Sequence, residues 1–119
     1  MKTFAASALA LVFAFGLAAE ASAHAKLVKS DPPANGQARD NRKLELTFSE
    51  EISGKLSGAA VKDSAGKTVP STSMVDQKGK GLMVTMTDPL KAGAYKIEWR
   101  AVASDDGHRT TGALAFTSK

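Results

Sequence analysis

Hydrophobic and polar residues alternate along several short segments of the chain. In residues 43–48, Leu44, Leu46 and Phe48 alternate with polar neighbours, and the same period of two extends over residues 94–103. Such alternation is typical of β-strands with one buried face. Shorter strands are predicted at residues 26–29, 82–86 and 113–118, and two more flank a turn at residues 64–67 within the segment 59–69. No segment has a long helical period, so the pattern predicts an all-β protein.

About seven short antiparallel strands joined by turns indicate an immunoglobulin-like Greek-key β-sandwich. Residues 90–95, LKAGAY, place Gly93 two residues before Tyr95, which opens the penultimate strand. This spacing resembles the tyrosine corner of immunoglobulin-like domains, where a tyrosine hydroxyl bonds back to the chain. We expect Tyr95 to tie this corner and Trp99, on the same face of the strand, to pack between the two sheets.

Strand direction predicts which connections meet at each end of the sandwich. If successive strands alternate in direction, His24, the residues after Phe48 and the segment after Ala103 all reach the same end. The tyrosine corner then lies at the opposite end. The segment after Ala103 reads SDDGHRTTG and contains His108, the second of the two histidines in the chain. Both histidines are therefore expected at one rim.

The first 23 residues have the three parts of a secretory signal. A basic start at Lys2 precedes an uncharged apolar run over about residues 4–19, and Ala-Ser-Ala ends the segment at residues 21–23. The apolar run is short for a membrane-spanning helix. We expect residues 1–23 to be removed, which leaves one domain at residues 24–119, exported and not embedded in a membrane, with His24 as its first residue.

The charge and cysteine content narrow the possible functions. The net charge is +4 and stays +4 after the predicted cleavage, because that removes one lysine, Lys2, and one glutamate, Glu20. The basic residues are scattered rather than gathered into a run, which argues against nucleic-acid binding. The chain contains no cysteine, so it has neither disulfides nor thiolate metal ligands. We expect a monomer that is stabilised by packing alone.

Three residues at the predicted rim suit a copper ion. A free N-terminal His24 offers its α-amine and its ring Nδ1, which together close a six-membered chelate ring on a metal. His108 adds a second imidazole, and Asp106 adds a carboxylate that projects to the same side if the segment is extended. Asp105, the rival carboxylate, is expected to point away. Three nitrogens and one oxygen suit Cu(II), whose affinity for such donors is the highest in the divalent series.

Several segments resemble the CopC family of periplasmic copper-resistance proteins over essentially the whole of residues 24–119. They are the terminal HAKL, SDPPANG, LTFSEEI, and the long segment LKAGAYKIEWRAVASDDGHRTTGALAFT. The resemblance implies that His24, Asp106 and His108 bind Cu(II), and that Glu50 of the F-S-E segment is a weak ligand. It also implies a carrier or buffer that acts in the periplasm in copper resistance or homeostasis and passes copper to an inner-membrane copper-transport protein.

The chain departs from the family in one respect. Some CopC proteins have a methionine-rich loop, with a histidine, that binds Cu(I) at the other end of the sandwich. The corresponding stretch here, VKDSAGKTVPSTSMV, contains Met74 and no histidine. Met83 and Met86 are three residues apart in a strand and should face opposite ways. We expect all three methionines to fill gaps among apolar residues rather than to form a Cu(I) site.

Two other classes of function fit parts of the pattern. A terminal histidine with a second imidazole also resembles the histidine brace of lytic polysaccharide monooxygenases, which are oxidative copper enzymes. Against this class, all aromatic residues after the predicted cleavage fall on predicted core faces, which leaves none to grip a polysaccharide: Phe48, Tyr95, Trp99 and Phe116. The third class is an immunoglobulin-like structural or adhesion module, which would bind no metal.

Overall fold

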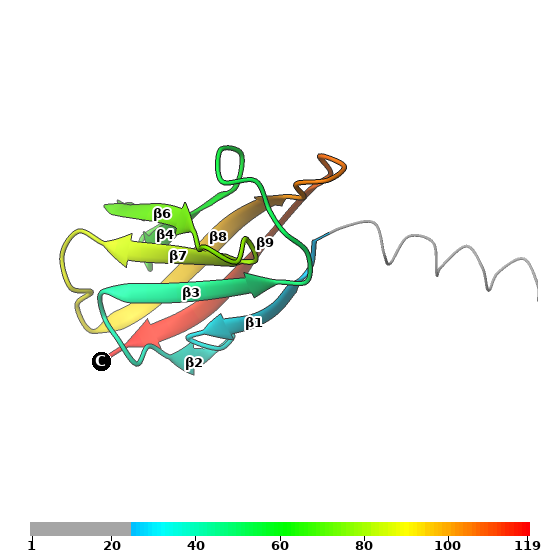
Figure 1. Cartoon of the computed structure of the whole chain (residues 1–119). Helices are drawn as coiled ribbons and strands as arrows, with labels where there is room; N and C mark the ends of the chain where they lie inside the picture. The colour runs from blue at the N-terminus through cyan, green and yellow to red at the C-terminus, as the bar shows by residue number, and fades with distance from the viewer. Residues whose placement is uncertain (1–24) are drawn as a thin grey trace, which may run out of the picture.

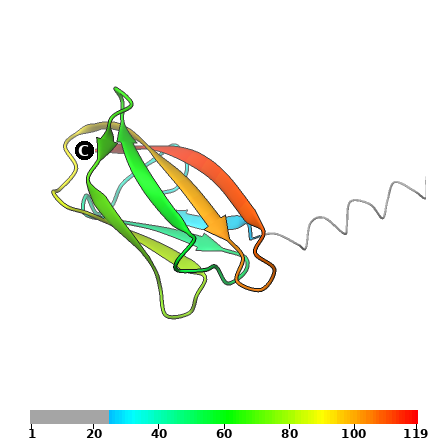
Figure 2. The ribbon, with the colours of Figure 1, turned by 90° about the horizontal axis from the view of Figure 1, so that it is seen from above.

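The structure is a computed structural model that describes residues 25–119, and these residues form two facing β-sheets and no helix (Figures 1 and 2). One sheet has four strands in the order β1-β3-β7-β6, and the other has five in the order β2-β9-β8-β4-β5. The strands are β1 (Leu27–Asp31), β2 (Gly36–Gln37), β3 (Lys43–Phe48), β4 (Gly58–Asp63), β5 (Thr68–Val69), β6 (Ser71–Val75), β7 (Gly81–Met86), β8 (Gly93–Val102) and β9 (Arg109–Ser118). Within residues 25–119 there is no helix long and apolar enough to cross a membrane.

The sheet order confirms an immunoglobulin-like sandwich. When the seven longer strands are lettered A to G along the chain, the sheets read A-B-E-D and G-F-C, the immunoglobulin arrangement. The fourth of these strands is β6, whereas the sequence pattern indicated β5. Strand directions at the rim are unaffected, because β5 continues through Pro70 into β6 and β6 still pairs antiparallel with β7.

Two strands and part of a third lie outside the sequence prediction. β6 is an edge strand of mostly polar residues, STSMV, so it has no clear alternation. β2 has only two residues and pairs parallel with β9, after a cis peptide bond at Asp31–Pro32. β9 begins at Arg109 rather than at residue 113, because its polar first residues pair with β8 along the full length of that strand.

The inward faces of the two sheets form one core. Phe48 of β3 packs edge-on against Trp99 of β8, with ring centroids 5.1 Å apart, so Trp99 bridges the two sheets as predicted. The buried side chains of β3 are those of the predicted alternation, and Ile97 and Ala101 of β8 are fully buried. The apolar residues of these strands therefore lie on the faces that are turned toward the other sheet.

Gly112 of β9 allows Trp99 to lie against the strand. A Cβ at this position would collide with Cζ2 of Trp99 and lie 2.8 Å from its Cε2. We expect Gly112→Ala to destabilise the fold by about 1–3 kcal/mol, since overpacking forces the indole out of its position. Urea unfolding followed by Trp99 fluorescence measures this. Ala113→Val is the control, because Ala113 is exposed and the added methyl groups should change stability by no more than about 0.5 kcal/mol.

The tyrosine corner is present. The hydroxyl of Tyr95 donates to the carbonyl of Lys91 at 2.8 Å, and the Tyr95 ring stacks on Phe116 with centroids 5.6 Å apart. We expect Tyr95→Phe to lower the free energy of unfolding by about 0.5–1.5 kcal/mol, because it removes the hydrogen bond and keeps the ring stacked. Chemical denaturation tests this, and an unchanged midpoint would mean that the hydroxyl contributes nothing to the corner.

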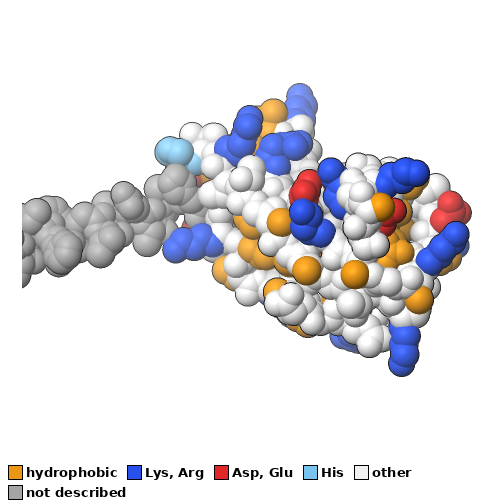
Figure 3. All heavy atoms as spheres, turned by 180° about the vertical axis from the view of Figure 1, so that it is seen from behind, with side chains coloured by type: hydrophobic (Ala, Val, Ile, Leu, Met, Phe, Trp, Pro, Cys, Tyr) orange, Lys and Arg blue, Asp and Glu red, His pale blue; other side chains and the backbone are white. Residues whose placement is uncertain are grey.

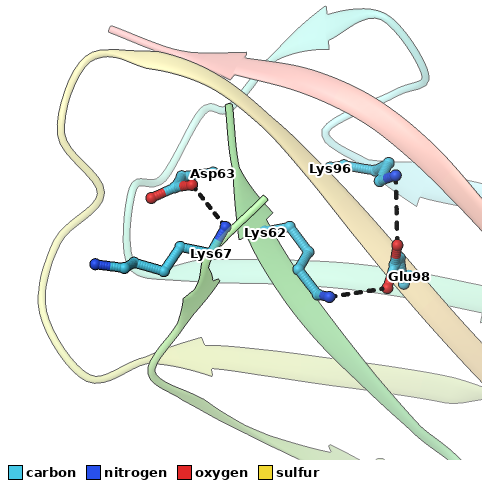
Figure 4. Close-up of polar contacts among 5 residues, drawn as sticks. All are labelled: Lys62, Asp63, Lys67, Lys96 and Glu98. Atoms are coloured by element: carbon cyan, nitrogen blue, oxygen red, sulfur yellow. Dashed lines mark hydrogen bonds and ion pairs between the residues drawn. The ribbon is translucent and has the colours of Figure 1, made fainter. Parts of the chain in front are cut away.

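The outer face of the five-stranded sheet carries charges of both signs. Figure 3 views this side of the molecule, where basic and acidic side chains are spread over the surface instead of forming one basic patch. Figure 4 shows the carboxylate of Glu98 between Lys96 and Lys62, at 3.4 and 3.6 Å. The hydrogen bond from Lys96, with the charge of Lys62, holds the pKa of Glu98 below its ordinary value.

The predicted turn between β4 and β5 is confirmed. Asp63 Oδ1 accepts a hydrogen bond from the backbone amide of Ala65 at 3.0 Å, and another from that of Lys67 at 2.9 Å, the second of which is drawn in Figure 4. Gly66 adopts a φ of 84° within this turn, a conformation that glycine reaches at little cost. The turn lies at the opposite end of the sheet from the turn between β8 and β9, because β4 and β8 run antiparallel.

Candidate metal centre

Backbone hydrogen bonds bring the predicted segments together at one end of the sandwich. The segment after β3 runs beside the segment after β8: Ile52 pairs with Ala103, and the Ser104 amide donates to the carbonyl of Glu51 at 2.9 Å. The loop between β6 and β7 joins them, since the Ile52 amide donates to the carbonyl of Gly79 at 2.8 Å. Figures 1 and 2 show the start of β1 at this same end. The predicted rim is therefore present.

The turn between β8 and β9 brings Asp106 and His108 together. The His108 amide donates to Asp106 Oδ1 at 3.1 Å, and Asp106 Oδ2 lies 2.9 Å from Nδ1 of the His108 ring. Gly107, between them, has a φ of 73°, and its amide donates to the carbonyl of Ala103 at 3.0 Å. The two side chains share one side, as expected, but they do so because of this tight turn and not because the segment is extended.

The Asp106 contact decides which nitrogen His108 presents to a metal. A neutral ring that donates from Nδ1 to the carboxylate keeps its lone pair on Nε2. Metal-bound histidines commonly have this arrangement, in which a carboxylate fixes the tautomer and the orientation of the ring. With a metal at Nε2, Asp106 on Nδ1 orients the ring, so Asp106 has to leave Nδ1 when its own carboxylate binds the same ion.

The beginning of the described chain is fastened beside this turn. Ala25 is fully buried, and its carbonyl accepts a hydrogen bond of 2.8 Å from the hydroxyl of Thr110, two residues after His108. Lys26 makes two bonds to Ser49: its amide donates to Ser49 Oγ at 2.9 Å, and its carbonyl accepts from the Ser49 amide at 2.8 Å. The predicted ligand His24 and the predicted signal, residues 1–23, lie outside the described residues.

The described part of the chain provides an incomplete metal site. Residues 25–119 contain no group of three or more histidine, aspartate or glutamate side chains placed to hold one ion. The structure brings Asp106 and His108 together, whereas Glu50 is exposed and forms no such group with them. Among the described residues, the turn therefore brings together two of the predicted ligands, Asp106 and His108.

The methionines differ partly from expectation. Met86 is 1% exposed and belongs to the core, and Met83 faces the other way, as predicted. Met74, however, is 68% exposed and lies directly opposite Met83 across β6 and β7. The expectation that Met74 fills a gap among apolar residues is wrong. Met74 lies in β6, a strand that the sequence pattern did not predict, so its exposed position could not be foreseen.

One hollow of the described surface lies away from the candidate ligands. It has a volume of about 730 Å³, and it opens over β4, β8 and β9, beside Glu98 and Arg100. None of Glu50, Asp106 and His108 lines it. Arg100 points its Nε to the carbonyl of Leu56 at 2.8 Å, so its guanidinium is held at the edge of the hollow by the loop before β4.

Comparison with known proteins identifies the family. The CopC domain model matches residues 27–119. The copper resistance protein C of Pseudomonas syringae pv. tomato is 36% identical over 117 residues, which cover 91% of this chain and 92% of that protein. The protein of the same name from Escherichia coli is 35% identical, with 87% and 88% covered.

A solved structure extends the similarity to the fold. The crystal structure of PcoC, a methionine-rich copper resistance protein from Escherichia coli, superposes with a TM-score of 0.75 at 33% identity and covers 82% of this chain and all of that one. The crystal structure of CopC from Methylosinus trichosporium OB3b gives a TM-score of 0.73 at 26% identity, with 81% of this chain and 94% of that chain covered. The chain belongs to the CopC family.

Proposed function

We propose that this protein is an exported Cu(II)-binding protein that acts in the periplasm as a carrier or buffer in copper resistance and homeostasis. In this proposal residues 1–23 are removed on export, and the new N-terminal His24 binds Cu(II) together with Asp106 and His108. The role is binding and not catalysis, and copper is the cargo. The copper-resistance names of the related proteins support this assignment.

One observation carries the proposal: the residue that follows His24 is held beside the Asp106–His108 turn. Thr110 and Ser49 fix Ala25 and Lys26 there through side-chain hydrogen bonds. Consecutive Cα atoms are about 3.8 Å apart, so His24 begins within one residue of this anchor. A histidine attached at that point has the reach to share an ion with His108.

The donor set supports Cu(II) in particular. The α-amine and Nδ1 of His24, an imidazole nitrogen of His108 and a carboxylate oxygen of Asp106 give three nitrogens and one oxygen, a set that suits the tetragonal geometry of Cu(II). An α-amine has an ordinary pKa of about 8, so copper displaces a weakly held proton at neutral pH. We include Glu50 as a weak outer ligand, because it directly follows Ser49, which holds Lys26.

The placement of the aromatic residues favours a binding role over oxidative attack on a polysaccharide. Phe48 and Phe116 are almost completely buried, and Tyr95 and Trp99 are half-buried against the core. The large apolar side chains most exposed on the described surface are aliphatic or thioether groups: Val28, Leu56 and Met74.

An inner-membrane copper-transport protein is the expected recipient of the copper.

A competition titration of the protein that begins at His24 tests the proposal. We expect one equivalent of Cu(II) to bind, and to bind much more tightly than Zn(II), because nitrogen-rich sites prefer copper in the divalent series. The control variant is His24→Ala, which keeps the amine and removes the ring nitrogen. Equal Cu(II) affinity in the control, or no copper binding by either protein, would contradict the proposed function.

A further inference from the structure

The hydroxyl of Thr110 joins two segments that are 85 residues apart in the chain. It donates to the carbonyl of Ala25 at 2.8 Å and lies 3.4 Å from the carbonyl of Ala101, its cross-strand neighbour. A threonine hydroxyl has a single proton. The shorter contact is the better hydrogen bond, so the proton is directed to Ala25.

Ala25 depends on this contact because it lies beyond the β1–β3 ladder. That ladder begins with Leu27 opposite Phe48, and a bulge follows between Leu27 and Lys29. The side chain of Ala25 is fully buried and its carbonyl is held by Thr110, so two separate contacts fix its orientation. The anchor closest to the start of the described chain is thereby fixed in orientation.

We propose that Thr110 is the positioning residue for the N-terminal half of the copper site. This inference rests on the proposed function. In this proposal the Thr110 hydroxyl keeps His24 close to the Asp106–His108 turn before copper arrives. The donors of His24 and those of the turn can then bind the same copper ion. Linked donors gain affinity from their high effective concentration, and they lose it when the link no longer holds them together. Thr110 touches no metal in this account and acts only through Ala25.

Three substitutions in the protein that begins at His24 test the role of the hydroxyl. Thr110→Val keeps the shape of the side chain and removes the donor, and we expect Cu(II) affinity to fall about 10- to 100-fold, as is typical when a supporting hydrogen bond of a metal site is lost. Thr110→Ser keeps the hydroxyl and should restore most of the affinity. Thr117→Val is the matched control, since Thr117 lies on the same strand and contacts the carbonyl of Gly36 at 3.5 Å.

The Thr110→Val substitution in a second protein distinguishes a positioning role of Thr110 from a general effect on the fold. In the protein extended by one glycine ahead of His24, the free amine of His24 that Thr110 is proposed to position is already absent, so Thr110→Val should change Cu(II) affinity by less than about threefold. Amide hydrogen exchange in the copper-free protein provides a metal-independent measurement. We expect faster exchange at the Lys26 amide in Thr110→Val, with little change at amides near Thr117.

The outcomes distinguish this inference from the proposed function. If the extended and native proteins bind Cu(II) equally, the proposed function is wrong and the inference fails with it. If the native protein binds more tightly but Thr110→Val binds like the native protein, only the positioning role is wrong. An equal loss of affinity in both backgrounds would also overturn it, because it would show that Thr110 supports the fold in general.

Discussion

A protein with one glycine added ahead of His24 should bind Cu(II) at least about 100-fold more weakly than the protein that begins at His24, the scale of affinity that linking of donors provides. The extension moves the free amine one residue away and turns the nitrogen of His24 into a peptide nitrogen, so the six-membered chelate ring with Nδ1 can form only when copper displaces the peptide proton, which is held far more tightly than that of an amine. The ring of His24 and the Asp106–His108 turn are retained. The difference in Cu(II) affinity therefore measures the contribution of the terminal amine to copper binding.

The fold should tolerate this extension. Ala25, Lys26 and their bonds to Thr110 and Ser49 all lie after the added residue. A glycine added after Lys119 is the matched control, because β9 carries the chain end to the opposite pole from the Asp106–His108 turn (Figure 1). We expect equal unfolding midpoints for all three proteins. Equal Cu(II) affinities in a competition titration would show that the amine is no ligand.

His108→Ala should also lower Cu(II) affinity, by about 100-fold or more, since it removes the second imidazole from the linked donor set. His108 is exposed at the surface of the turn, so the substitution should change the free energy of unfolding by no more than about 0.5 kcal/mol. The Cu(II) EPR spectrum should change as well, because a nitrogen donor is replaced by water.

Arg109→Ala provides the neighbouring control for His108. Arg109 is an exposed residue at the start of β9, and the proposed donor set does not include its side chain. We expect it to leave both the affinity and the spectrum unchanged. A His108→Ala protein whose affinity and spectrum match those of the native protein would remove His108 from the site, and the Asp106–His108 contact would then be only a feature of the turn.

The sequence predicts the sandwich well because burial decides its longer strands. Residues 43–48 and 94–103 alternate regularly, since one face of each strand packs into the core. β6 is not predicted, because an edge strand with polar residues on both faces has no alternation of hydrophobic and polar residues. The exposed Met74 opposite Met83 is missed for the same reason, since cross-strand neighbours become visible only when both strands are known.

The candidate site is predictable in its location but only partly in its details. Strand direction alone brings Ala25, the segment after Phe48 and the Asp106–His108 turn to one end. The Gly107 turn and the roles of Ser49 and Thr110 do not follow from the sequence. Serine and threonine occur throughout the chain, and a hydroxyl that bonds to a distant carbonyl leaves no periodic signal. Only the three-dimensional arrangement identifies these two as anchors.

Pulsed EPR on the one-to-one Cu(II) complex of residues 24–119 shows whether His24 and His108 bind the same copper ion. The remote ring nitrogens of coordinated imidazoles modulate the electron spin echo, and combination frequencies report how many imidazoles bind the same ion. We expect two imidazoles on one copper in the native protein, and one each in His24→Ala and His108→Ala. A single imidazole in the native complex would contradict the claim that the new N-terminus and the Asp106–His108 turn bind one cupric ion together.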